Sequence, residues 1–158
     1  MLNGCFYFRK GDELKKFKSF QYSYQNSSNS KYFALMFTQS DTIFLKNYSP
    51  TNHDTLSYSL LHFSERDTIN SFLEKIDSCN SDSINDLNNS HERIVFDLDF
   101  VNEKHSVYLQ SFHPPLAFVK FNSWINSLKD CHNFTPIDTF IEFKEDANIH
   151  NAIGQNSR

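Results

Sequence analysis

Apolar and polar residues alternate along much of the first part of the chain. This pattern predicts β-strands, because successive side chains of a strand point to opposite faces. Strands are predicted at residues 17–25, where aromatic and polar residues alternate, and at residues 31–39, 42–48 and 55–63. The second and third flank Ser40–Asp41, which we interpret as the turn of a hairpin. In the first segment, Phe20, Tyr22 and Tyr24 share one face.

The period changes after Ser64, which is expected to cap the N-terminus of a helix. Four apolar residues then recur at helical spacing: Ile69, Phe72, Leu73 and Ile76. They predict an amphipathic helix over residues 65–78. The polar residues 80–90 are interpreted as a loop.

A second pair of strands is predicted at residues 93–100 and 106–112. One face of the first of these strands is apolar throughout: Ile94, Phe96, Leu98 and Phe100. The other face carries Val95, Asp97 and Asp99. We therefore expect one face of the sheet to pack inward and the other to face water.

The last part of the chain predicts two more helices. Residues 116–121 fit either a strand or a helix, and we favour a helix at least from Asn122. Its apolar stripe is Phe118, Phe121, Ile125 and Leu128. Thr135 is expected to cap a final helix with Pro136 at its first position. The buried stripe of that helix is predicted to be Ile137, Phe140 and Ile141.

Strands and helices therefore follow one another without strict alternation. That order predicts an α+β fold, with a mostly antiparallel sheet and two or three helices packed on one face. A single domain is expected over residues 1–150, and residues 151–158 are predicted to be a flexible tail.

Composition narrows the classes of function. The chain has only three glycines, which excludes the glycine-rich loops that bind phosphates. Its three cysteines include no C-x-x-C pair, so we expect reduced thiols and a cytoplasmic location. We identify no signal peptide and no apolar run that would span a membrane. We also expect no cofactor.

The formal charge of −4 is unevenly distributed. Residues 65–103 contain three basic and ten acidic residues, a balance of −7. An acidic surface repels nucleic acid and attracts basic partners. The predicted partner-binding residues are Asp82, Asp86, Glu92, Asp97, Asp99 and Glu103.

Candidate chemistry is sparse. Asp97 and Asp99 on one strand face leave open a metal-dependent enzyme, because paired carboxylates bind magnesium. Lysines near an aromatic sheet leave open single-stranded nucleic-acid binding, in which rings stack on bases. Cys131 and His132 are adjacent, but adjacent side chains diverge, so we interpret them as structural rather than as a reactive pair.

Two segments resemble immunity proteins of bacterial contact-dependent growth inhibition systems. The first is FVNEKHSVYLQ at residues 100–110, which is similar to a strand pair of the form F-x-x-E-K-x-V-Y-V-Q with one extra residue. The second is DCHNFTPIDTFIEF at residues 130–143, which resembles an acidic-Cys-His-x-Phe-Ser/Thr-Pro segment followed by F-I-E. The two segments lie within residues 100–143, which make up about a quarter of the chain.

This resemblance implies a small cytoplasmic protein that binds a cognate toxin domain, often nuclease-like, and blocks its active site. It also implies that the chain has no catalytic activity of its own.

Overall fold

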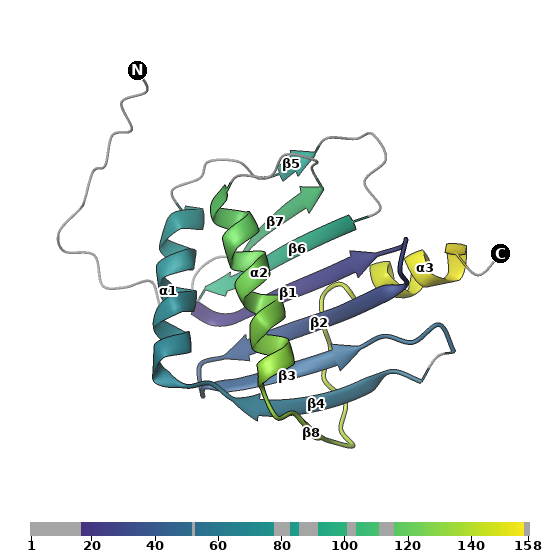
Figure 1. Ribbon diagram of the computed structural model, residues 1–158, viewed down its shortest axis with the longest axis horizontal. Coiled ribbons are helices and arrows are strands. Elements are labelled where there is room, and N and C mark those ends of the chain that lie inside the picture. The colour runs from purple at the N-terminus through teal and green to yellow at the C-terminus, as the bar shows by residue number, and fades with distance from the viewer. Residues whose placement is uncertain are drawn as a thin grey trace.

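The computed structural model describes residues 17–51, 53–77, 83–85, 92–100, 104–110 and 116–156. Within those ranges, side chains are described except in Phe17–Lys18, Leu73–Asp77, β5, Glu92, the latter part of β6 (Phe96–Phe100), β7 and the last two residues of α3. The fold is α+β: six antiparallel strands form the body of a sheet, and three helices pack on it (Figure 1). The predicted fold class is thereby confirmed.

The sheet has eight strands in the order β5-β7-β6-β1-β2-β3-β4-β8. Their bounds are β1 Phe17–Asn26, β2 Lys31–Thr38, β3 Thr42–Asn47, β4 Thr55–Leu60, β5 Ser83–Asn85, β6 Glu92–Phe100, β7 Lys104–Gln110 and β8 Thr135–Pro136. The hairpin at Ser40–Asp41 is confirmed, and Asp41 has the positive φ of 57° that tight turns favour. The short β5 lies within the predicted polar loop and pairs in parallel with β7.

Helices α1 (Phe63–Asp77) and α2 (Leu116–Cys131) run across one face of the sheet (Figure 1). The predicted apolar stripe of α2 is confirmed, because all four of its residues are buried. They pack against Phe20, Tyr22 and Tyr24 of β1 and against neighbouring rings of β2. The aromatic face of the first strand is therefore the main core of the molecule.

The opposite face is covered as well. Helix α3 (Asp146–Asn156) and the segment before it bring Phe143, Ile149 and Ile153 against Tyr32 and Ala34 of β2. Our expectation of helices on one face and water on the other is wrong for this part of the sheet. The reason lies in β2, whose sequence YFALMF is apolar at consecutive positions and so requires cover on both sides. Val95 of β6, expected to face water, is 1% exposed.

The predicted first helix is confirmed, but its cap differs. The helix begins at Phe63, and the carboxylate of Glu65 accepts a hydrogen bond from the backbone N–H of His62 at 2.7 Å. This is the acidic half of a capping box, with Glu65 two residues beyond the first helical residue. Ser64 lies inside the first turn and is not the cap.

The C-terminal helix lies about ten residues later than predicted. Thr135 and Pro136 pair with β4 as β8, and the N–H of Ile137 donates to the carbonyl of Leu56 at 3.0 Å. Edge pairing of the backbone thus replaces the helix cap expected at Thr135. Phe140, predicted to be buried, is exposed, whereas Ile141 packs beneath α3. Residues 151–156, predicted to be a flexible tail, form the second half of α3.

The core predicts which substitution in α2 will cost stability. Ile125→Ala should lower the free energy of unfolding by about 2–5 kcal/mol, because it leaves a cavity where a fully buried side chain was removed. Val119→Ala is the matched control, since Val119 lies on the same helix and is 44% exposed. It should cost less than about 1 kcal/mol. Urea unfolding followed by Trp124 fluorescence measures both, and equal losses would contradict the proposed packing.

Candidate functional site

Three of the predicted partner-binding carboxylates belong to β6. In the backbone register, Glu92 lies opposite Asn26, Asp97 opposite Gln21, and Asp99 opposite Ser19. Their side chains are outside the described part of the structure. So are the whole residues Asp82, Asp86 and Glu103. The acidic binding surface therefore stays a prediction, and so does a metal site at Asp97 and Asp99.

The β1 residues beside that acidic strand are polar but buried. Gln21, Ser23 and Gln25 are each more than nine-tenths covered, and the Gln21 side chain accepts a hydrogen bond from the backbone N–H of Lys144 at 3.0 Å. Arg93 of β6 forms a 2.9 Å ion pair with buried Glu145. Ser23 Oγ and Gln25 Nε2 have no hydrogen-bond partner within the described residues. A polar layer therefore separates the centre of the sheet from the segment that leads into α3.

His132 is the centre of the first polar cluster. Its Nδ1 lies 3.0 Å from the hydroxyl of Ser59 on β4, and its Nε2 lies 2.9 Å from Glu65 Oε1 on α1. The ring also contacts Phe134 and His62, at 5.9 and 5.7 Å between ring centroids. His132 directly follows α2, so one side chain joins α2, α1 and β4.

The order Ser59–His132–Glu65 is also that of the hydroxyl, imidazole and carboxylate in a serine-hydrolase triad. With the ring neutral, Nε2–H donates to the carboxylate and Nδ1 accepts the hydroxyl proton, the same order that activates a serine nucleophile in hydrolases. Here, however, the His132 side chain is only 6% exposed, and Ser59 does not line the groove described below. We interpret the cluster as a latch between three elements, in keeping with the structural role assigned to His132 from the sequence.

A second polar cluster fixes α3 to the sheet. Asp146, at the start of α3, accepts hydrogen bonds from the Tyr48 hydroxyl and from Lys46 Nζ, the latter at 2.9 Å. It also accepts the backbone N–H of Phe143 at 3.2 Å, which begins the helix as a cap does. Asp54 lies 3.7 Å from Lys46 and 3.1 Å from His150 Nε2. The loop between β3 and β4 is thus tied to α3.

Tyr48 is held neutral by this arrangement. Burial, followed by its hydrogen bond to the Asp146 carboxylate, raises the pKa of Tyr48 far above its usual value. Ionising the phenol would place two negative charges side by side in a poorly solvated site. Tyr48 therefore acts as a hydrogen-bond donor and not as an acid at physiological pH.

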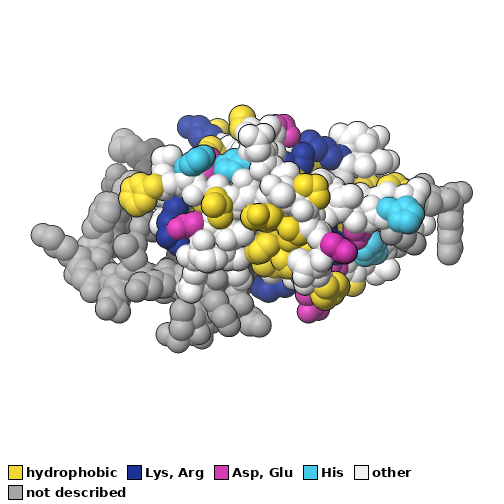
Figure 2. All heavy atoms as spheres, turned by 90° about the horizontal axis from the view of Figure 1, so that it is seen from below, with side chains coloured by type: hydrophobic (Ala, Val, Ile, Leu, Met, Phe, Trp, Pro, Cys, Tyr) yellow, Lys and Arg dark blue, Asp and Glu magenta, His cyan; other side chains and the backbone are white. Residues whose placement is uncertain are grey.

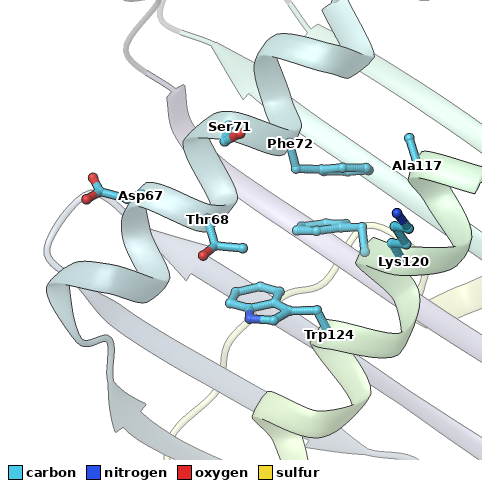
Figure 3. Close-up of a pocket in the computed structure, with 8 residues that line it drawn as sticks. Asp67, Thr68, Ser71, Phe72, Ala117, Lys120 and Trp124 are labelled. Carbon is cyan, nitrogen blue, oxygen red and sulfur yellow. The ribbon is translucent and has the colours of Figure 1, made fainter.

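A groove of about 480 Å³ lies between α1 and α2. Asp67, Thr68 and Ser71 line it from α1, while Lys120 and Trp124 line it from α2 (Figure 3). Its floor is a ladder of parallel rings, in which Phe121 stacks on both Phe72 and Trp124. Because Phe72 and Phe121 also belong to the main core, the groove is the outer surface of the helix-to-helix packing.

Large apolar side chains are exposed elsewhere on the described surface. They are Tyr58, Leu60, Phe63, Leu116, Val119 and Phe140. Tyr58 and Leu60 lie on β4, beside the outermost strand β8. Figure 2 looks onto this edge and shows hydrophobic side chains gathered in the middle of the face, with histidines towards both ends.

No protein-family model matches the chain, and no curated protein matches it either. The described part of the structure contains no helix long and apolar enough to cross a membrane. Among the same residues there is no group of three or more histidine, cysteine, aspartate or glutamate side chains arranged to hold a metal ion. Function must therefore be inferred from the surface and its chemistry.

Both polar clusters escaped the sequence analysis. Each joins residues far apart in the chain: the first spans 73 positions from Ser59 to His132, and the second 100 positions from Lys46 to Asp146. A local signal existed for Glu65, which stands three residues after His62 as a capping acid does. A local signal also existed for Asp146, since an acid precedes the weakly apolar stripe Ile149–Ile153.

The latch predicts a stability loss without a loss of fold. His132→Gln should lower the free energy of unfolding by about 1–3 kcal/mol, because the amide oxygen and nitrogen do not occupy the positions of the two ring nitrogens and leave Ser59 or the Glu65 carboxylate without its partner. His53→Gln is the control, because His53 is exposed and lies outside the cluster. Thermal unfolding followed by circular dichroism measures both. In the same preparations a fluorophosphonate should leave Ser59 unlabelled, whereas labelling that His132→Gln abolishes would refute the latch.

The Tyr48 cluster predicts a pH dependence. The pKa of Tyr48 in the folded state lies above its usual value of about 10. The contribution of its neutral hydroxyl to stability is therefore complete below pH 10. It falls as the pH rises further, by up to about 1.4 kcal/mol per pH unit. Tyr48→Phe should remove this part of the alkaline loss while lowering stability at pH 7 by about 1–3 kcal/mol. Urea unfolding at pH 7, 10 and 11 tests it. Tyr58→Phe, at an exposed site, should leave the pH profile unchanged.

Proposed function

We propose that this chain is an immunity protein, which binds a cognate toxin domain and neutralises it by covering its active site. The observation that supports a binding role is the set of large apolar side chains held exposed on a well-packed framework. Exposed aromatic and aliphatic side chains of this kind are typical of protein interfaces. Such a role requires a rigid surface and no catalytic group of its own.

Single-stranded nucleic-acid binding fits the described residues less well. The aromatic rings of β1 and β2 that we considered for base stacking are buried beneath α1 and α2. A base cannot stack on a ring that is already covered by a helix. The basic residues considered with them, Arg9, Lys10, Lys15, Lys16 and Lys18, lie outside the described side chains.

The second segment that resembles immunity proteins, residues 130–143, contributes to both the framework and the surface. His132 latches three elements, Phe134 packs against the main core, and Thr135–Pro136 form β8. Phe140 and Glu142 of the same segment are exposed. The segment thus combines framework residues with surface residues, as a binding protein needs, and it supports the proposal on that ground.

The mechanism follows from steric exclusion and charge. A partner's active site is blocked when a rigid surface occupies it, and an acidic binder associates faster with a basic enzyme because opposite potentials steer the encounter. The formal charge of −4 favours such a partner. Many toxin domains of the nuclease class would meet this condition, because they must bind phosphates.

The test is neutralisation in living cells. Bacteria that express the toxin domain encoded immediately upstream of this chain's gene should stop growing, and co-expression of the chain should restore growth. The purified pair should form a one-to-one complex by light scattering. Failure of protection at equal expression, or the absence of any toxin gene beside this one, would count against the proposal.

The acidic strand can be tested in the same complex. Asp97→Asn combined with Asp99→Asn should weaken toxin binding by at least about tenfold, roughly 1.4 kcal/mol, if partner cations lie against these carboxylates. Titration calorimetry at two salt concentrations provides the measurement. Affinity unchanged at both concentrations would exclude β6 from the interface.

A further inference from the structure

The segment between β8 and α3 carries an unusual side chain. Phe140 is 83% exposed, although it is among the largest apolar residues of the chain. A solvent-exposed phenylalanine forfeits the free energy that burial of its ring would contribute. Residues 137–142, which we call the Phe140 ridge, therefore present an apolar group to water on the described surface.

The Phe140 ridge is anchored at both ends. On one side, Thr135 pairs with Tyr58 of β4, and the Ile137 N–H donates to Leu56 at 3.0 Å. On the other side, Ile141 and Phe143 pack into the core beneath α3. Anchoring on both sides restricts the backbone around Phe140, so little conformational freedom remains to be lost when a partner covers the ring.

The charges beside Phe140 have one sign. Asp138 precedes it by two residues and Glu142 follows it by two, and both are exposed. Neither forms an ion pair or hydrogen bond within the described part of the structure. An aromatic group flanked by two uncompensated carboxylates is complementary to an apolar depression bordered by lysine or arginine.

Phe63 provides an internal comparison. It is exposed to nearly the same extent, 81%, at the start of α1. The charged residues that follow it are already engaged: Glu65 binds His132 and the His62 N–H, and Arg66 pairs with Asp41 at 3.0 Å. Only Asp67, one helical turn further on, is exposed and unpaired within the described residues, so Phe63 lacks the pair of flanking carboxylates that accompanies Phe140.

We propose that the Phe140 ridge is the anchor of the partner interface. Its partner is a basic protein surface in which an apolar pocket receives the Phe140 ring, while lysine or arginine side chains at the pocket's border meet Asp138 and Glu142. This inference rests on the proposed function and specifies the partner chemistry that the function requires. A central aromatic residue with a charged border is the usual arrangement of an interface hot spot.

The experiment compares two matched phenylalanines. The probe is the toxin domain encoded immediately upstream, carrying a substitution that removes its toxicity, and binding is measured by titration calorimetry. Phe140→Ala should weaken binding at least about thirtyfold, as expected for a hot-spot aromatic residue. Phe63→Ala should change it by less than about threefold. Circular dichroism should show both variants folded, because both side chains are exposed.

The role of the flanking acids is tested by measuring the association rate with the toxin domain. Asp138→Asn with Glu142→Gln should slow association several-fold at low salt, and the difference should shrink at high salt because such interactions are screened. Asp67→Asn with Asp130→Asn is the control, because it makes the same change of charge at other exposed sites. It should slow association less than Asp138→Asn with Glu142→Gln does.

The outcomes separate the two proposals. If wild-type chain binds the toxin domain and Phe140→Ala binds equally well, the ridge is not the anchor, although the proposed function stands. If Phe63→Ala is as damaging as Phe140→Ala, the interface does not depend on the flanking charges, and the inference is overturned. If wild-type chain does not bind the domain at all, the proposed function itself fails.

Discussion

The constraint on which this fold depends is that β2 is apolar on both of its faces. Phe33, Leu35 and Phe37 point to the side covered by α1 and α2, while Tyr32 and Ala34 point to the side covered by α3. A strand of this kind is stable only when both faces are removed from water. The sheet therefore requires helices on both of its faces.

Polar side chains set where the helices dock. His132 joins the end of α2 to the start of α1 and to β4, and Asp146 joins the start of α3 to Tyr48 and Lys46. The hydrophobic effect is non-directional, whereas a hydrogen bond constrains both the distance and the direction between its donor and acceptor. The two clusters therefore give the layers a defined relative position, and a binding surface spread over several elements needs such definition.

Residue patterns were sufficient to predict the six longer strands, the first two helices and the buried residues of α2, but not β5 or β8. Most of these elements bury one face and so repeat their apolar residues with a regular period, while β2 is a short run of consecutive apolar residues; a single sequence displays both patterns. The C-terminal part was harder, because Thr135–Pro136 is as good a helix start as any in the chain. Its edge pairing with Tyr58 depends on a strand about 75 residues earlier, which no local pattern reveals. The exposure of Phe140 follows from that same pairing, and so the ridge was invisible in the sequence. The polar partners of His132 were hidden for the same reason.

The outermost position of β8 affects the tendency of the protein to aggregate at high concentration. An open sheet edge invites a second chain to pair with it, and this is a common first step towards fibrils. Here the last strand is two residues long and one of them is Pro136, which has no N–H to offer. A neighbouring chain would find no continuous row of donors and acceptors there. The protein can therefore keep apolar side chains exposed near this edge, available to a specific partner, with less risk that copies of itself will join strand to strand.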